Sequence, residues 1–148
     1  YSPEHASRFR PPKAKGQWYG AQSVYGACAE VAYWRHRFIL DSAGLLDQVL
    51  LTEHSIFQGV LDGTSIDLME QPWTQARAEW THGSDYGATQ SVAAEAQLRC
   101  VQWLGYASVR APGERCAVAF EFGHCVHAED PGSSDLGNHG NSIGVLRW

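Results

Sequence analysis

Three polar residues near the N-terminus recur at a constant interval. Arg8, Tyr19 and Glu30 are eleven residues apart, and the short aromatic stretch Gln17 to Ala21 between the first and last of them is typical of a strand. If a helix follows the strand, the segment can aim a guanidinium, a phenol and a carboxylate into one cleft. This set of groups suits a small anionic ligand.

The residues after this strand predict a helix that carries Glu30. Ser23 is a good N-cap, and the apolar spacing predicts a helix from Val24 to about Asp41. Glu30 lies at the edge of the predicted buried stripe, so it is either a solvated flank residue or a site group. The stripe consists of Val24, Ala27, Cys28, Val31, Trp34 and Phe38.

Composition excludes several classes of protein. The 148 residues are enough for one domain with a proper core, and no apolar run has the length of a membrane span. A net charge of −5 argues against a nucleic-acid surface as the main function. A local basic cluster, Arg8, Arg10, Lys13 and Lys15, is suited to a small phosphorylated ligand. The start at Tyr1 rather than Met leads us to expect that N-terminal residues are missing.

Cysteines and histidines give no metal pattern that we can match. The four cysteines form no CxxC pair, which favours a reduced, cytoplasmic protein. Two of them, Cys28 and Cys100, are expected on apolar helix faces. The cluster from His124 to His127, with His139 downstream, does not have an established zinc spacing, so no metal is expected.

The rest of the chain predicts alternating strands and helices without repeats. Asp85 is the expected cap of a second long helix, Tyr86 to Leu104, with Trp103 on its apolar face and Gly105 at its end. The pattern as a whole predicts an α/β or α+β fold, a single domain with a mixed sheet and flanking helices. Strands are expected at 48–61, 65–68, 106–109, 115–122 and 143–148, and a loop with a short helix at 69–83.

Four stretches in the same order resemble segments of one known family. They are SRFRPP, GQWYGAQSVYGACAEVAYWR, LMEQPWTQARAEWTHGSDYGATQ and GYASVRAPGERCAVAF, and together they reach from Tyr1 to about Phe122. The chain resembles a RES domain, the toxin of bacterial RES/Xre toxin–antitoxin pairs. The resemblance implies a fold related to the ADP-ribosyltransferases and cleavage of NAD between nicotinamide and ribose. NAD is then a substrate, with inorganic phosphate, water or a protein as acceptor of the ADP-ribosyl group.

The resemblance assigns catalytic roles to three residues. Glu30 matches the family glutamate, and a carboxylate beneath the ribose suits the oxocarbenium character that develops when the bond breaks. Arg8 matches the motif arginine, whose planar fork of donors suits a pyrophosphate. Ser108 matches the motif serine and is expected to hold the ribose or the incoming phosphate; a local turn bond is the alternative for this residue.

Further residues are expected to bind NAD beside Arg8. Tyr19 would stack on nicotinamide or hydrogen-bond the ribose, or else serve as a core aromatic. Tyr1 matches the tyrosine of an upstream Arg-Tyr pair whose arginine would precede this chain. Arg10 is an alternative to Arg8 as the clamp. Arg110, His82 and Tyr86 are weaker candidates for the pocket wall.

Three functions are compatible with these residues. The first is a toxin that depletes NAD by phosphorolysis or hydrolysis, and the second is a protein ADP-ribosyltransferase. The third is an inactive RES-like binding module. The resemblance implies an Xre-like antitoxin as partner and a homodimer, with neither direct nucleic-acid binding nor a membrane.

Overall fold

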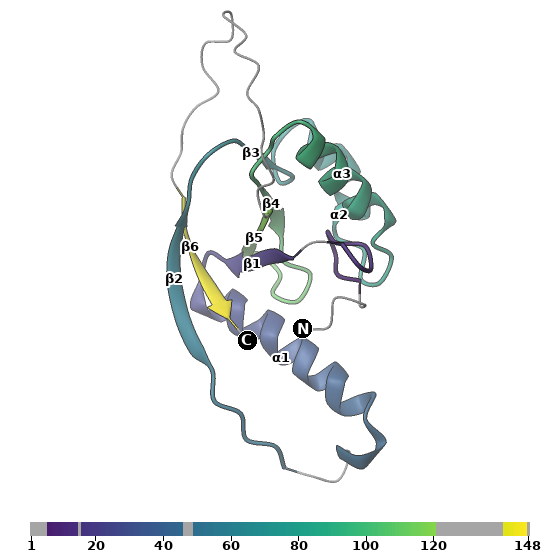
Figure 1. The fold of residues 1–148 in the computed structure, drawn as a ribbon, viewed down its shortest axis with the longest axis vertical. Coiled ribbons are helices and arrows are strands. Elements are labelled where there is room, and N and C mark those ends of the chain that lie inside the picture. Colours follow the sequence, from purple (N-terminus) through teal and green to yellow (C-terminus); the bar gives the residue numbers. More distant parts are fainter. Residues whose placement is uncertain (1–5, 15, 46–48, 121–140, 148) are drawn as a thin grey trace, which may run out of the picture.

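A mixed sheet of six strands is the frame of the fold, with the strand order β2-β6-β1-β5-β4-β3 (Figure 1). The computed structural model describes residues 6–14, 16–45, 49–120 and 141–147. Strands β3 and β4 pair in parallel, and the other neighbours pair antiparallel. This single α+β domain confirms the predicted fold class. The strands are β1 (Gln17–Ala21), β2 (Ser55–Leu61), β3 (Ser65–Asp67), β4 (Trp103–Ala107), β5 (Arg115–Phe120) and β6 (Asn141–Arg147).

The predicted strand and helix at the N-terminal side are confirmed. Strand β1 covers Gln17–Ala21, and the first helix, α1, covers Val24–Leu40. Ser23 is the N-cap, and its Oγ accepts a hydrogen bond of 2.9 Å from the backbone N–H of Gly26. Gly26 lets the helix start close to the sheet, since a Cβ at this position would lie 3.3 Å from the Cβ of Ala21.

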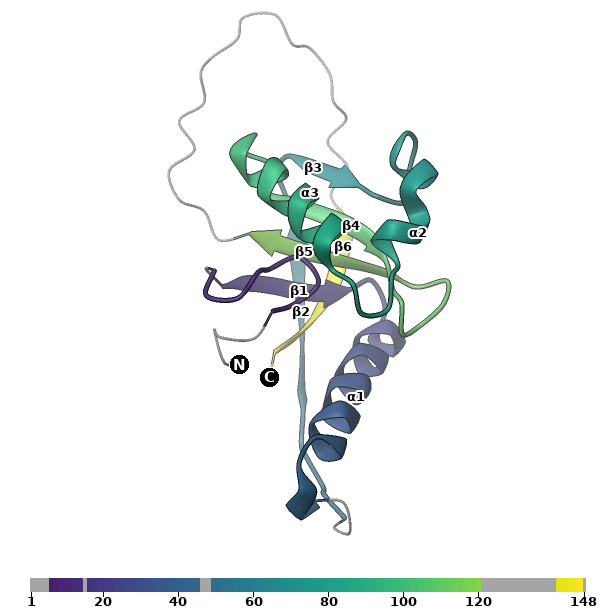
Figure 2. The ribbon, with the colours of Figure 1, turned by 90° about the vertical axis from the view of Figure 1, so that its right-hand side faces the viewer.

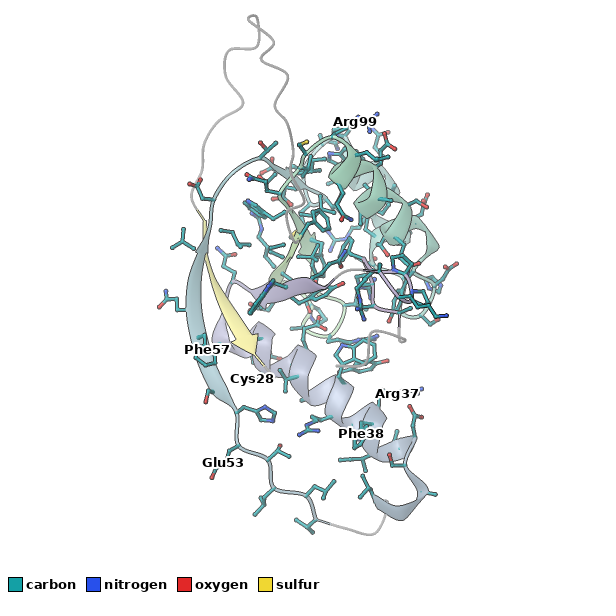
Figure 3. All side chains as sticks on the ribbon, viewed as in Figure 1. Cys28, Arg37, Phe38, Glu53, Phe57 and Arg99 are labelled. Carbon is teal, nitrogen blue, oxygen red and sulfur yellow. The ribbon has the colours of Figure 1, made fainter. Side chains whose placement is uncertain are left out.

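The predicted buried stripe of α1 is largely wrong. Ala27 and Val31 are buried, together with Gly26, so the helix buries only a narrow face. The first turns of α1 contact the sheet, but its second half leads away from it, as Phe38 in Figure 3 shows. Exposed positions of the predicted stripe occur in the first turns as well as in the second half of the helix. The exposed stripe residues are Val24, Cys28, Trp34 and Phe38.

The second long helix ends earlier than predicted. Helix α3 covers Gly87–Leu98, and its N-cap is Tyr86 rather than the predicted Asp85, whose Oδ1 accepts a bond of 3.0 Å from the N–H of Gly87. The chain then turns at Cys100, whose φ of 57° is left-handed and incompatible with a continuing helix. Trp103 is therefore not on a helix face but buried in β4, and Cys100 also lies outside the helix. Gly105, expected at the helix end, lies within β4.

The other predicted elements are partly confirmed. The expected strand at 48–61 begins only at Ser55, and the described residues before it, 49–54, are not strand. The predicted short helix in the loop is present as a 3-10 turn, Trp73–Ala76, followed by α2, Arg77–Trp80. Strand β4 starts three residues before the predicted strand at 106–109. Within the described ranges, no helix is both long and apolar enough to cross a membrane.

The main core lies on the sheet face that carries the helices. Leu104 and Tyr106 of β4 alternate with Trp103, so the first two side chains point to one face and Trp103 to the other. Ala27 of α1 and Ala93 of α3 both belong to the main core. Figure 2 shows α2 and α3 close to the sheet and α1 leading away from it. The helices thus meet the ends of β1 and β4 at the same face, where the candidate site lies.

Candidate functional site

A serine and a glutamate from distant parts of the chain form a hydrogen-bonded pair. Ser108 Oγ donates a bond of 2.8 Å to Oε1 of Glu30, 78 positions earlier. The same Oγ accepts bonds from the backbone N–H groups of Arg110, at 3.2 Å, and Ala111, at 3.0 Å. A hydroxyl has one proton and two lone pairs. With both backbone donors on its oxygen, the single proton of Ser108 is directed at the Glu30 carboxylate.

The local fold fixes both members of this pair. Ser108 follows β4 directly and is 6% exposed, and its N–H donates to the carbonyl of Glu114, closing the turn before β5. Glu30 lies on the second turn of α1 and is half-buried. Glu114 also accepts a hydrogen bond from the Ser23 hydroxyl, which ties the same turn to the start of α1. The helix and the turn are therefore held together at two places.

Two buried titratable groups lie beneath the pair. Tyr106 and Cys116 face each other across β4 and β5. Burial raises the pKa of the Tyr106 phenol well above its ordinary value, with Cys116, Tyr19 and Glu30 acting in the same direction and Arg8 opposing them. Burial, together with the charge of Glu30, raises the pKa of the Cys116 thiol to about 12. Both groups therefore stay neutral at ordinary pH, which limits the negative charge near Glu30.

Arg8 stands at the tip of a tight turn. The backbone N–H of Ser7 bonds the carbonyl of Arg10 at 2.9 Å, and the reverse bond is 3.1 Å, so Arg8 and Phe9 form the two-residue tip. Phe9 is completely buried against Tyr106, with ring centroids 4.7 Å apart. The anchored Phe9 holds the turn on the core and leaves the Arg8 side chain half-buried at the surface.

The Arg8 guanidinium holds backbone carbonyls. Its Nη1 donates to the carbonyl of Trp80 at 3.0 Å and to that of His82 at 2.9 Å. The guanidinium carbon also lies 5.0 Å from the centre of the Tyr86 ring. Among the described residues, all hydrogen bonds of the Arg8 side chain come from Nη1. The Nε and Nη2 donors can therefore serve a ligand without breaking them.

Tyr19 uses its hydroxyl to fix this turn. The Tyr19 OH lies 2.7 Å from Ser7 Oγ, donates to Gln17 Oε1 at 3.0 Å, and lies 3.3 Å from the backbone N of Phe9. The hydroxyl is thus engaged with the protein, while Tyr19 still influences Tyr106 electrostatically. The structure thus joins Tyr19 to the turn that carries Arg8, and Ser108 to Glu30.

Of the other two candidates for NAD binding, Arg10 and Tyr1, the structure describes Arg10 alone. Arg10 is 3% exposed, and its Nη1 reaches the carbonyl of Ala14 at 3.4 Å. Arg10 is thus more deeply buried than Arg8, which is half-buried. Tyr1 lies outside the described residues, as do the His124–His127 cluster and His139.

Sequence reasoning did not identify the residues that support the Arg8 turn. Thr89 Oγ1 of α3 donates to the carbonyl of Arg8, and Gln90 Nε2 donates to the carbonyls of Ser7 at 3.0 Å and Arg10 at 3.2 Å. Thr89 is completely buried. The adjacent Thr-Gln pair in the first turn of a helix was the available signal, because two neighbouring polar side chains there are suited to bonding a passing backbone.

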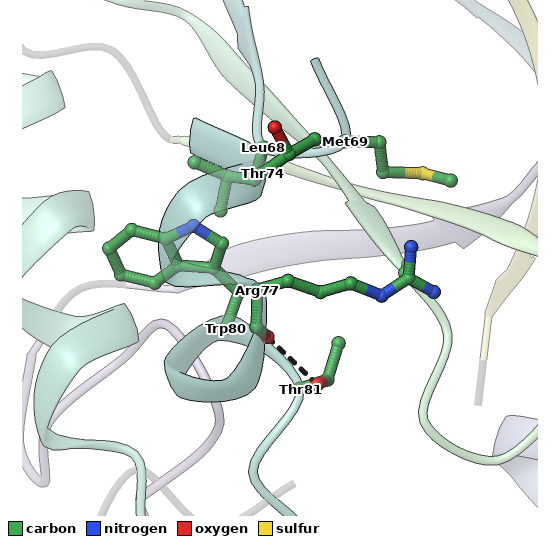
Figure 4. A pocket seen from close by; sticks show the side chains of 7 residues that line it. Leu68, Met69, Thr74, Arg77, Trp80 and Thr81 are labelled. Atoms are coloured by element: carbon green, nitrogen blue, oxygen red, sulfur yellow. Dashed lines mark hydrogen bonds between the residues drawn. The ribbon is translucent and has the colours of Figure 1, made fainter. Parts of the chain in front are cut away.

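A small hollow lies beside the site but is not part of it. Seven residues line it, and Figure 4 shows Arg77 and the Trp80 indole among them. The hollow borders the site, because Ala107 directly precedes Ser108 and the carbonyl of Trp80 accepts a hydrogen bond from Arg8. None of the sequence-predicted site residues lines it, however, so we place the candidate site at the Glu30–Ser108 pair. The lining consists of Leu68, Met69, Thr74, Arg77, Trp80, Thr81 and Ala107.

Metal-ligating groups do not gather within the described part of the chain. No three histidine, cysteine, aspartate or glutamate side chains there are grouped to hold an ion. Among the described residues, Cys28 and Cys116 are free thiols. The polar side-chain groups described at the candidate site are the Glu30 carboxylate, the Ser108 hydroxyl and the Arg8 guanidinium.

The fold and the site together define a small α+β domain with a glutamate–serine pair and an arginine-bearing turn. A family model described as the RES domain matches residues 1–137, and the chain belongs to this family. RES domains are generally NAD-degrading enzymes, described as toxins, and typically pair with Xre antitoxins. A comparison with curated proteins gives no match.

Proposed function

We propose that this chain is the toxin of a toxin–antitoxin pair and cleaves NAD at the bond between nicotinamide and ribose. The observation that carries the proposal is the hydrogen bond from Ser108 to Glu30 in a chain that belongs to the RES family. A half-buried carboxylate in a fixed orientation is what stabilisation of a positively charged ribose requires.

In the proposed reaction, one bond of the ribose breaks and another forms. The bond from ribose C1 to the nicotinamide nitrogen breaks, and its electron pair goes to the ring, which leaves as neutral nicotinamide. Positive charge develops on C1 and the ring oxygen of the ribose, and the Glu30 carboxylate stabilises it. An oxygen of inorganic phosphate then bonds to C1 and gives an ADP-ribose phosphate. With water as acceptor, the product is ADP-ribose and a proton is released.

The surrounding residues serve binding and orientation in this proposal. Arg8 binds the pyrophosphate through the donors that the Trp80 and His82 carbonyls do not use. Ser108 keeps the Glu30 carboxylate in one orientation, so that little reorganisation is needed as charge develops. Tyr19 positions the Arg8 turn through its hydroxyl. The partner that we propose is an Xre-like antitoxin in the cytoplasm, with the toxin as a homodimer.

The acceptor can be determined directly. The purified chain is incubated with NAD, with and without inorganic phosphate, and nicotinamide and the ribosyl product are separated by chromatography. Release of nicotinamide that depends on phosphate supports phosphorolysis, and release without phosphate supports hydrolysis. Release only after a target protein is added, with label on that protein, would replace both with protein ADP-ribosylation. Failure to release nicotinamide under all three conditions would contradict the proposal and favour a binding module.

A further inference from the structure

The loop Thr81–Tyr86, between α2 and α3, is held by two arginines from different parts of the chain. Arg8 donates to the carbonyl of His82 at 2.9 Å, and Arg110 Nη2 donates to the carbonyl of Gly83 at 3.0 Å. We call residues 81–86 the bridging loop. Neighbouring carbonyls of the loop thus face guanidinium groups from the N-terminal turn and from the turn after β4.

The bridging loop has little apolar burial to hold it. Residues 82–85 are exposed. Inside the loop, His82 Nδ1 accepts bonds from the N–H groups of Ser84, at 3.3 Å, and Asp85, at 2.7 Å. These bonds set the loop's shape but do not fix its place on the domain. Its placement therefore depends strongly on Arg8 and Arg110, since an exposed segment with few contacts opens easily.

Arg110 contacts Ser108 and the helix that carries Glu30. Its guanidinium carbon lies 3.5 Å from the centre of the Tyr33 ring, and Tyr33 is three residues after Glu30 on α1. Its backbone N–H donates to Ser108 Oγ at 3.2 Å. One side chain thus connects α1, the turn after β4 and the bridging loop.

We propose that Arg110 is a positioning residue that sets the bridging loop, and through it the Arg8 side chain, relative to Glu30. This inference rests on the proposed function in one respect, namely that Arg8 binds NAD. Loss of the Arg110 contacts leaves the Gly83 carbonyl with the longer bond of 3.4 Å from the Tyr86 hydroxyl, which lies within the loop, and lets the loop move. The carbonyls that hold Arg8 Nη1 move with it, so NAD binding suffers more than the chemical step at Glu30.

Amide hydrogen exchange tests the positioning role of Arg110 even if the protein does not cleave NAD. In the full chain, we expect peptides over residues 81–87 to exchange at least about threefold faster in Arg110→Lys and Tyr33→Leu than in the wild type. Lysine keeps the charge but loses the planar stack and the fork of donors. Tyr33→Phe keeps the ring, so its exchange should equal that of the wild type. Arg37→Lys, on the exposed part of α1, is the matched control. Unchanged exchange in Arg110→Lys would overturn the proposal.

Kinetics with NAD then separates positioning from chemistry. We expect Arg110→Lys to raise the KM for NAD by about five- to tenfold while kcat changes by less than about twofold. A fall in kcat at constant KM would overturn the positioning role and place Arg110 in the reaction itself. If the wild type does not cleave NAD, the proposed function fails, and the exchange experiment still decides whether Arg110 holds the loop.

Discussion

Ser108 donates its only proton to Glu30 while two backbone N–H groups occupy its oxygen. The pair therefore has one arrangement of donors and acceptors, and it joins the turn after β4 to the second turn of α1. Removal of either group leaves the other with an unmet bond in a half-buried setting. Both stability and the proposed reaction should consequently respond to changes at these two positions.

Ser108→Ala should weaken the fold as well as the activity. The variant leaves the N–H groups of Arg110 and Ala111 without their acceptor, so we expect the free energy of unfolding to fall by about 1–3 kcal/mol. Urea unfolding followed by circular dichroism measures this change. Ser91→Ala is a suitable control, because Ser91 is exposed and bonds only the Gly87 carbonyl of its own helix. Equal stability of the two variants would mean that the Ser108 hydroxyl does not support the turn.

Arg8→Lys should weaken NAD binding more than it weakens the fold. A lysine cannot bond the Trp80 and His82 carbonyls and a pyrophosphate at the same time with a planar fork. We expect the Kd for NAD, measured by calorimetry on a Glu30→Gln background, to rise about tenfold or more. Arg37→Lys on the same background controls for a general effect of the substitution. An unchanged Kd would mean that Arg8 is not the residue that binds the pyrophosphate.

The raised pKa of Cys116 predicts its reactivity. Its thiol has an ordinary pKa of 9.0 that burial raises to about 12, so it stays protonated at pH 8.5. Iodoacetamide at this pH should label the exposed Cys28 and leave Cys116 unlabelled until urea is added. Peptide mass spectrometry distinguishes the two sites. Rapid labelling of Cys116 in the folded protein would show that this part of the core is open.

The same shift gives a pH dependence of stability. The folded state keeps the Cys116 proton between pH 9.0 and about 12, whereas the unfolded state loses it there. The stabilisation from this group is therefore complete below pH 9 and is lost as pH rises toward 12. Urea unfolding across this range should show a smaller loss of stability in Cys116→Ala than in the wild type. A loss of equal size in both proteins would exclude Cys116 as a contributor.

The parts of the fold that depend on local sequence could be predicted. Strand β1 and the start of α1 are examples, because a β-prone aromatic run and the Ser23 cap act within a few residues. The end of α3 could not, because its helical pattern runs on through Cys100, which takes a left-handed φ without being glycine. Burial of Trp103 in the sheet decides that boundary, and burial is a tertiary effect.

The candidate site likewise depends on contacts between distant parts of the chain that local sequence does not reveal. Glu30 and Ser108 lie 78 positions apart, and only the resemblance to a family paired them before the structure was seen. Arg110, His82 and Tyr86 could be named as candidates from the sequence, but the bonds that join Arg8 and Arg110 to the bridging loop could not, because their acceptors are backbone carbonyls that every residue has. Residue types can therefore indicate candidate residues but not the backbone contacts that hold this loop.

The most direct test of the central claim compares nicotinamide release by the wild type and Glu30→Gln. Glutamine keeps the shape and can still accept the Ser108 bond but lacks the charge, so we expect turnover to fall by about 10² or more with an unchanged fold. Glu53→Gln, at an exposed position before β2, should match the wild type. Near wild-type nicotinamide release by a folded Glu30→Gln protein would contradict the account.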